Sequence, residues 1–142
     1  MIEDVLITPL DIIKTSGGKV MHAMKKSHSG YMGFGEAYFS QVAEGTVRAW
    51  KRHKNMTLNL VVPLGKIKFV LFDNRGEAKA QFQEIVLSES NYVRLTIPPG
   101  IWFGFQGLAI GKSMLLNIAN VEHDPHEVEN KGIEYIEFNW GD

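Results

Sequence analysis

The sequence contains no cysteine, which excludes disulfide scaffolds, zinc–cysteine sites and thiol nucleophiles. It has no uninterrupted apolar run of about 18 residues, so we expect no membrane-spanning helix. Acidic residues stand at the N-terminus where a secretory signal carries a basic flank. An excess of one charge is also lacking, because 15 Lys and Arg stand against 16 Asp and Glu, whereas nucleic-acid-binding domains are usually basic. We therefore expect a cytoplasmic protein with neither a nucleic-acid nor a membrane partner.

A long amphipathic helix is missing as well, and the hydrophobic pattern has a period close to two. The 142 residues, 44% of them hydrophobic, suit a single domain spanning residues 1–142. Short runs of strand formers alternate with turn signals at intervals of roughly 8–12 residues, which is typical of a sandwich, jelly roll or barrel. We expect an all-β fold with strands at residues 4–13 (broken at Pro9), 19–25, 46–54, 56–63, 66–73, 80–88, 92–98, 101–108 and 113–121.

The clearest local signal predicts a hairpin of residues 59–63 and 66–73. Pro63 ends the first run, and Gly65 in the Leu64-Gly65 turn can adopt the positive φ that a tight reversal requires.

The most informative segment is Val47-Arg48-Ala49-Trp50-Lys51-Arg52-His53-Lys54. Strand alternation predicts that Ala49, Lys51 and His53 share one face, with the remaining basic residues and Trp50 on the other. A basic side chain inside a barrel is costly unless it is paired or binds an anion. Two interpretations stay open: an anion site, or a solvated basic face opposite a half-buried one.

The order of VRAWKRHK, a glycine turn, IPPGIWFGFQGL and LLNIANVEHDP over roughly residues 30–140 resembles the dTDP-4-dehydrorhamnose 3,5-epimerase family of sugar-nucleotide cupins. Its first motif is also similar to the Arg-Gly-x-His-x-His-Lys of dTDP-sugar 3,4-ketoisomerases. The resemblance implies a cupin-type jelly roll and a nucleotide-linked 4-keto-6-deoxysugar substrate in surface polysaccharide biosynthesis. It further implies no cofactor and a homodimer that exchanges N-terminal strands, so that His22, Lys25 or Tyr38 reach the partner's site.

Carried over residue by residue, the resemblance departs from the epimerase pattern at its catalytic positions. Arg48 matches the family arginine, and His53 with Lys54 match the second histidine and the lysine of the ketoisomerase motif. Lys51 stands where the epimerase has its catalytic histidine, Phe103 where it has a later histidine, and Asn117 where it has its tyrosine. We expect no counterpart of the C-terminal extension that carries the aspartate partner of the epimerase histidine.

Epimerisation beside a ketone needs a base on one face of the sugar and an acid on the other. Lys51 is a base only if desolvation and neighbouring cations lower its pKa. His53 needs less help, because an imidazole titrates near neutral pH. Tyr38, Tyr92 and Tyr135 are possible acids, and the sequence places none of them opposite Lys51. Lys51, His53 and Tyr38 form the candidate catalytic set.

Basic side chains would bind a diphosphate, aromatic rings would stack on base or sugar or else pack in the core, and amides would bind polar groups. The candidate binding residues are Arg48, Trp50, Arg52, Lys54, Asn59, Tyr92, Trp102 and Asn117.

Two other functions stay open beside the isomerase. One is a non-catalytic cupin that binds a sugar nucleotide or carbohydrate. The other is a metal-dependent cupin, but the usual His-x-His pair has become Lys51-Arg52-His53, and His123, His126 and Glu127 fall in a polar turn. We expect no metal.

Overall fold

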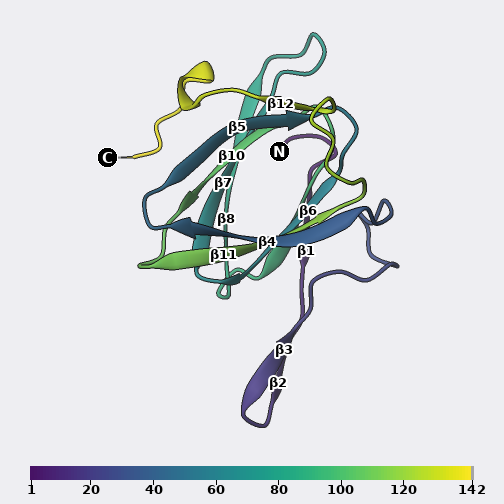
Figure 1. Ribbon diagram of the computed structural model, residues 1–142, viewed down its shortest axis with the longest axis vertical. Coiled ribbons are helices and arrows are strands. Elements are labelled where there is room, and N and C mark those ends of the chain that lie inside the picture. Colours follow the sequence, from purple (N-terminus) through teal and green to yellow (C-terminus); the bar gives the residue numbers. More distant parts are fainter. Residues whose placement is uncertain (142) are drawn as a thin grey trace.

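The computed structural model describes residues 1–141, and strands dominate it. Its body consists of two five-stranded antiparallel sheets that face each other (Figure 1). The first sheet has the order β1 (Leu6–Pro9), β9 (Val93–Ile97), β6 (Leu58–Leu64), β11 (Lys112–Ala119) and β4 (Glu36–Ala43). The second has the order β12 (Val128–Asn130), β5 (Val47–His53), β10 (Trp102–Gly107), β7 (Lys66–Asp73) and β8 (Gln81–Ser88). The predicted all-β jelly roll is confirmed.

The main core fills the space between the two sheets with side chains that alternate along the strands. Leu58 and Leu60 of β6 meet Phe69 and Leu71 of β7 there, all at most 1% exposed. The burial of each of these side chains stabilises the fold by about 1.5–3 kcal/mol. A rigid wall of this kind holds neighbouring polar side chains of β5 and β11 in place.

The connection between β6 and β7 differs from the sequence prediction. These strands do not pair: β6 pairs with β9 and β11, while β7 pairs with β8 and β10. The hairpin prediction is therefore wrong, because a turn signal sets where the chain reverses and not which strands become neighbours. Gly65, at φ +87°, instead carries the chain from one sheet to the facing sheet.

Gly65→Ala should lower the free energy of unfolding by about 2–4 kcal/mol. A Cβ atom at this position would lie 2.3 Å from Ser113 Oγ and 2.7 Å from Ser113 Cα, and the backbone has positive φ. Urea denaturation measures the change. Gly76→Ala is the matched control, since it also has positive φ but no atom within 4 Å of the added Cβ, so it should cost only the backbone strain. Equal losses in both variants would contradict the role of Ser113.

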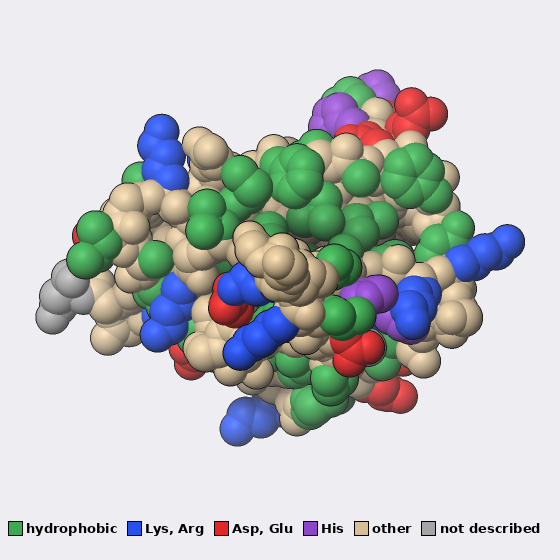
Figure 2. All heavy atoms as spheres, turned by 90° about the horizontal axis from the view of Figure 1, so that it is seen from below, with side chains coloured by type: hydrophobic (Ala, Val, Ile, Leu, Met, Phe, Trp, Pro, Cys, Tyr) green, Lys and Arg blue, Asp and Glu red, His purple; other side chains and the backbone are tan. Residues whose placement is uncertain are grey.

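Two short strands, β2 (Ile12–Thr15) and β3 (Gly18–Met21), form a separate ribbon. The ribbon projects from the barrel in Figure 1. Figure 2, viewed from below, looks along it onto a face where many hydrophobic side chains gather. The predicted break in the first strand at Pro9 agrees with the end of β1.

The chain between β3 and β4 is tied to the barrel by one buried arginine. Arg94 is fully buried and donates to the carbonyls of Ala23 and Ser29, to the His28 ring and to Asn59 Oδ1. These bonds fix the segment that leads into β4, which forms one wall of the site described below.

The C-terminal segment lies on the outer face of the second sheet. After β12 it forms a short 3-10 helix, η1 (Ile133–Tyr135), and continues past Trp140 (Figure 1). Among the described residues, no helix is long and apolar enough to cross a bilayer.

Candidate active site

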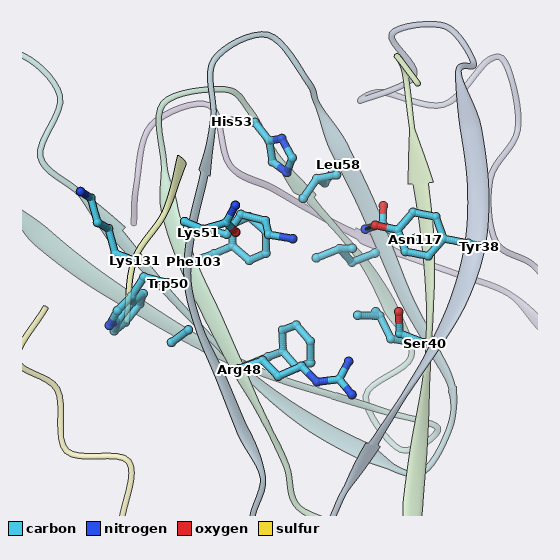
Figure 3. Close-up of a pocket in the computed structure, with 15 residues that line it drawn as sticks. Tyr38, Ser40, Arg48, Trp50, Lys51, His53, Leu58, Phe103, Asn117 and Lys131 are labelled. Carbon is cyan, nitrogen blue, oxygen red and sulfur yellow. Dashed lines mark hydrogen bonds between the residues drawn. The ribbon is translucent and has the colours of Figure 1, made fainter. Parts of the chain in front are cut away.

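A cavity of about 410 Å³ opens between the two sheets (Figure 3). Its polar wall comes from β5, with Arg48, Lys51 and His53, and the opposite wall from β4 and β11, with Tyr38 and Asn117. The remaining lining residues include the apolar side chains Leu58, Leu60, Phe103, Phe105 and Leu115. A hollow that combines apolar side chains with convergent polar groups is suited to a small molecule.

A β-bulge in β5 decides which basic side chains enter the cavity. Lys51 is the partner of Phe103 in β10, but the next residue of β10, Gly104, is the partner of Ala49, so Trp50 has no partner there. Arg48, opposite Phe105, therefore shares the cavity face with Lys51 and His53. The simple alternation that placed Arg48 on the opposite face is wrong at this point, because a bulge adds one residue to one strand.

His53 and Glu127 form a buried pair at one end of the cavity. His53 Nδ1 is hydrogen-bonded to Glu127 Oε1, and the two residues are only 8% and 6% exposed. The other carboxylate oxygen, Oε2, accepts the backbone N–H groups of Asn55 and Met56, each at 2.9 Å. The carboxylate is thus held by three donors and in turn fixes the imidazole, whose ring points into the cavity in Figure 3.

The electrostatics of this pair favour a neutral imidazole. Burial lowers the pKa of His53 below its ordinary value, the Glu127 carboxylate works against that effect, and nearby Lys51 adds to it. Burial raises the pKa of Glu127, but the hydrogen bonds from His53, Asn55 and Met56 outweigh it, so the net shift is downward. With Nδ1–H donating to an ionised carboxylate, the Nε2 atom of neutral His53 carries a free lone pair.

Tyr38 and Asn117 lie side by side on the opposite wall. They are register partners in β4 and β11, and Asn117 Nδ2 donates to the Tyr38 hydroxyl oxygen at 3.0 Å. Burial raises the pKa of Tyr38, and Glu36 raises it further. Tyr38 therefore keeps its proton, and this proton is free to be donated into the cavity. Asn117 Oδ1 is buried without a hydrogen-bond partner among the described residues.

A smaller hollow of about 140 Å³ adjoins the cavity and shares Tyr38, Lys51, His53 and Asn130 with it. His123 and Glu36 line its outer part, where Glu36 accepts the His123 backbone N–H. The imidazole and the phenol thus border a polar extension of the site.

Six of the residues predicted from sequence line the cavity: Tyr38, Arg48, Trp50, Lys51, His53 and Asn117. Trp50 borders it although its indole packs on the other side of β5. The side chains of Trp50, Arg52 and Trp102 turn to the opposite face of their sheet. Trp50 packs against Trp140, while Arg52 pairs with Glu129 and lies over the Trp102 ring. Lys54 is exposed and does not line the cavity.

Two further candidates lie away from the cavity. Asn59 is buried on the outer side of β6, where its amide binds Gly30, Arg94 and Thr96. The Tyr92 hydroxyl donates to the His22 carbonyl at 2.8 Å. Both residues tie the N-terminal segment to the barrel, and their contacts give no support for a ligand-binding role.

Sequence reasoning left Glu127 in a polar turn and gave it no catalytic role. In the structure its carboxylate is hydrogen-bonded to His53. No local signal in the sequence points to this role, because Glu127 reaches His53 through the pairing of Val128–Asn130 with β5, which is a tertiary contact. Within residues 1–141 no group of three or more His, Cys, Asp or Glu side chains is close enough to hold a metal ion.

No family model matches this chain, but individual proteins do. A dTDP sugar isomerase from Desulfovibrio desulfuricans G20 has a solved structure with a TM-score of 0.93 and 33% identity, over 97% of this chain and 91% of that one. The "Probable low-salt glycan biosynthesis epimerase Agl13" of Haloferax volcanii is 27% identical over 94% of this chain and 88% of its own length. A dTDP-6-deoxy-D-glucose-3,5-epimerase from Legionella pneumophila shares the fold at 18% identity and a TM-score of 0.81, over 94% of this chain and 75% of that one.

The first of these matches exceeds what a shared fold alone produces, because a third of the residues are identical over nearly the whole of both chains. Together with the jelly roll and the motif in β5, it confirms the resemblance seen in the sequence. The chain belongs to the family of the dTDP sugar isomerase and shares its fold with the 3,5-epimerases.

Proposed function

We propose that this protein is an isomerase or epimerase that enolises a dTDP-linked 4-keto-6-deoxysugar. The observation that carries the proposal is the His53–Glu127 pair at one end of the cavity, with Tyr38 on the facing wall. A base and an acid on opposite sides of a bound sugar are what inversion next to a ketone requires.

In the first step, Nε2 of neutral His53 removes the proton from the carbon next to the ketone. The C–H electron pair becomes the new C=C bond, and the carbonyl π pair moves onto oxygen to give an enolate. Glu127 stabilises the imidazolium that forms, because it accepts the Nδ1–H bond. Positive charge beside the substrate stabilises the enolate, and Lys51 lies on the same wall as His53.

In the second step, the carbon takes a proton from the Tyr38 hydroxyl on the other face, and the enolate returns to a ketone with inverted configuration. Asn117 orients this hydroxyl through its Nδ2 donor. The unpaired Asn117 Oδ1 is placed to accept a sugar hydroxyl. If His53 returns the proton instead, the configuration is retained and only isotope exchange is seen.

The ligand class follows from the charges and from the relatives. Arg48 offers a guanidinium to the cavity, in addition to the Lys51 ammonium near the enolate, and a guanidinium suits a diphosphate. Two of the relatives are named as a dTDP sugar isomerase and a probable glycan biosynthesis epimerase. We therefore propose a role in the synthesis of a surface polysaccharide.

Proton NMR of dTDP-4-keto-6-deoxyglucose with this protein in deuterated water tests the proposal. Deuterium should appear at C3 or C5 faster than in a control without protein, and the labelled carbon identifies the site of enolisation. Exchange with inversion indicates an epimerase, and migration of the ketone indicates a ketoisomerase. Line broadening without exchange would overturn the enzymatic proposal in favour of a non-catalytic binding cupin.

Tyr38→Phe should separate the two proton transfers. Exchange with retention through His53 should persist, whereas the rate of inversion should fall about 10²-fold because the acid on the second face is lost. NMR measures both rates in one sample. Tyr135→Phe is the control, since Tyr135 is exposed on the outer face near Trp102. An unchanged inversion rate in Tyr38→Phe would remove Tyr38 from the mechanism.

A further inference from the structure

The bulge in β5 is the element that turns Arg48 into the cavity, and its outer side is held by the C-terminal segment. In the bulge, Trp50 has no partner in β10. Its backbone N–H donates instead to the Lys131 carbonyl at 2.8 Å, and its carbonyl accepts from the Lys131 N–H at 2.9 Å. Both backbone groups of the extra residue are therefore satisfied by one residue of the C-terminal segment.

The Trp50 side chain is held from the same side. Its indole N–H donates to the Ile133 carbonyl at 3.2 Å. Its ring packs at 5.5 Å from Trp140 and edge-on to Phe138 at 6.4 Å, measured between ring centroids. Trp50 is 2% exposed and Trp140 is 8% exposed. In Figure 3 the Trp50 side chain lies on the side of β5 away from Arg48 and His53.

The bulge also depends on Gly104 of β10, the partner of Ala49. A Cβ atom at position 104 would lie 2.6 Å from the Ala49 Cβ. A glycine there makes room for the bulge, but it has no side chain that could hold the bulge in place. Lys68 of β7 lies over the rings of Phe138 and Trp140, at 5.7 and 5.6 Å from their centroids, and joins the C-terminal segment to the sheet.

We propose that residues 131–140 act as an outer strap that stabilises the β5 bulge, and that Trp50 and Trp140 are positioning residues for Arg48. Neither tryptophan faces the ligand. They act through the backbone, because a β5 strand without the bulge would return Arg48 to the outer face by simple alternation. The inference rests on the proposed function in one respect, which is that Arg48 binds the diphosphate.

A double-mutant cycle on dTDP affinity, measured by calorimetry, tests the strap. Arg48→Ala should weaken dTDP binding about 10- to 100-fold, as expected for a charge-assisted hydrogen bond. Trp140→Ala should weaken it about fivefold by misplacing Arg48, but should cost almost nothing when Arg48 is already alanine. Trp140→Phe, which retains a ring, should restore most of the affinity. The rate of deuterium exchange at saturating substrate should change less than twofold in Trp140→Ala.

Tyr135→Ala is the matched control. It removes a ring from the same segment, but this ring packs against Trp102 rather than against Trp50. Wild-type affinity in Trp140→Ala, or additive losses in the double variant, would overturn the strap. If Trp140→Ala does not fold, Trp140→Leu replaces it in the cycle. If the wild-type protein does not bind dTDP, the proposed function fails by itself. A crystal structure of the Trp140 variant then decides the strap, by showing whether Arg48 still enters the cavity.

Discussion

His53→Gln should lower the rate of deuterium exchange into dTDP-4-keto-6-deoxyglucose by about 10²–10⁴-fold, the usual contribution of a general base. The imidazole is the only cavity side chain bonded to a buried carboxylate in the described structure. The Gln side chain keeps a donor for Glu127 but has no basic nitrogen, so the fold should survive. Proton NMR gives the rate, and thermal unfolding checks the fold.

His126→Ala is the matched control for this substitution. His126 precedes Glu127, is exposed and does not line the cavity, so exchange should be normal. Lys51→Met separates the two candidate bases. If His53→Gln exchanged normally while Lys51→Met did not, Lys51 would be the base and the assignment of His53 would be wrong.

Glu127→Gln should reduce the exchange rate about 10²–10³-fold, because it affects both the tautomer and the charge of the imidazole. An amide can donate to Nδ1, which would move the imidazole proton to Nε2 and leave no lone pair for the substrate. Loss of the carboxylate also removes the group that raises the pKa of His53, so this pKa should fall further. The protonated imidazolium would then lack its partner during turnover.

The pH profile separates a positioning role of Glu127 from a purely structural one. In the wild type the acidic limb of kcat/KM should have its midpoint below the ordinary pKa of histidine, since burial lowers the pKa of His53. In Glu127→Gln the limb should move to still lower pH. A profile that kept its position while only its height fell would contradict the proposed coupling.

Glu127→Ala should be less stable than Glu127→Gln. A glutamine oxygen can still accept the Asn55 or Met56 N–H, whereas alanine leaves the part-buried Asn55 donor and the buried Met56 donor without an acceptor. Each unsatisfied group costs about 1–3 kcal/mol. The folded pKa of Glu127 is depressed, so the stability that its charge contributes is present above the unfolded pKa. It is lost as the pH falls through the folded value. Urea denaturation near neutral pH and at pH about 3 measures this effect: the difference in free energy of unfolding between the wild type and the variants should be smaller in acid.

Alternating strand formers and glycine turns determined by themselves that the chain is all-β, because these signals are local. They located most strands but missed β4 and β12. The motif around residues 48–54 and its order relative to the later glycine segments indicated the family and directed attention to His53. Local signals did not determine which strands pair. The sequence around Gly65 predicts a hairpin, yet β6 and β7 belong to the two facing sheets.

Two features of the site came only from tertiary structure. The bulge at Trp50 brings Arg48 to the face of Lys51 and His53, and it depends on β10 and on Lys131. Glu127 reaches His53 across 74 positions of the sequence. Strand periodicity describes which side chains share a face of a regular strand, but it contains no information on an added residue or on a distant carboxylate. Contacts between distant residues decide both, which is why the base, its partner and the acid came together only in the folded barrel.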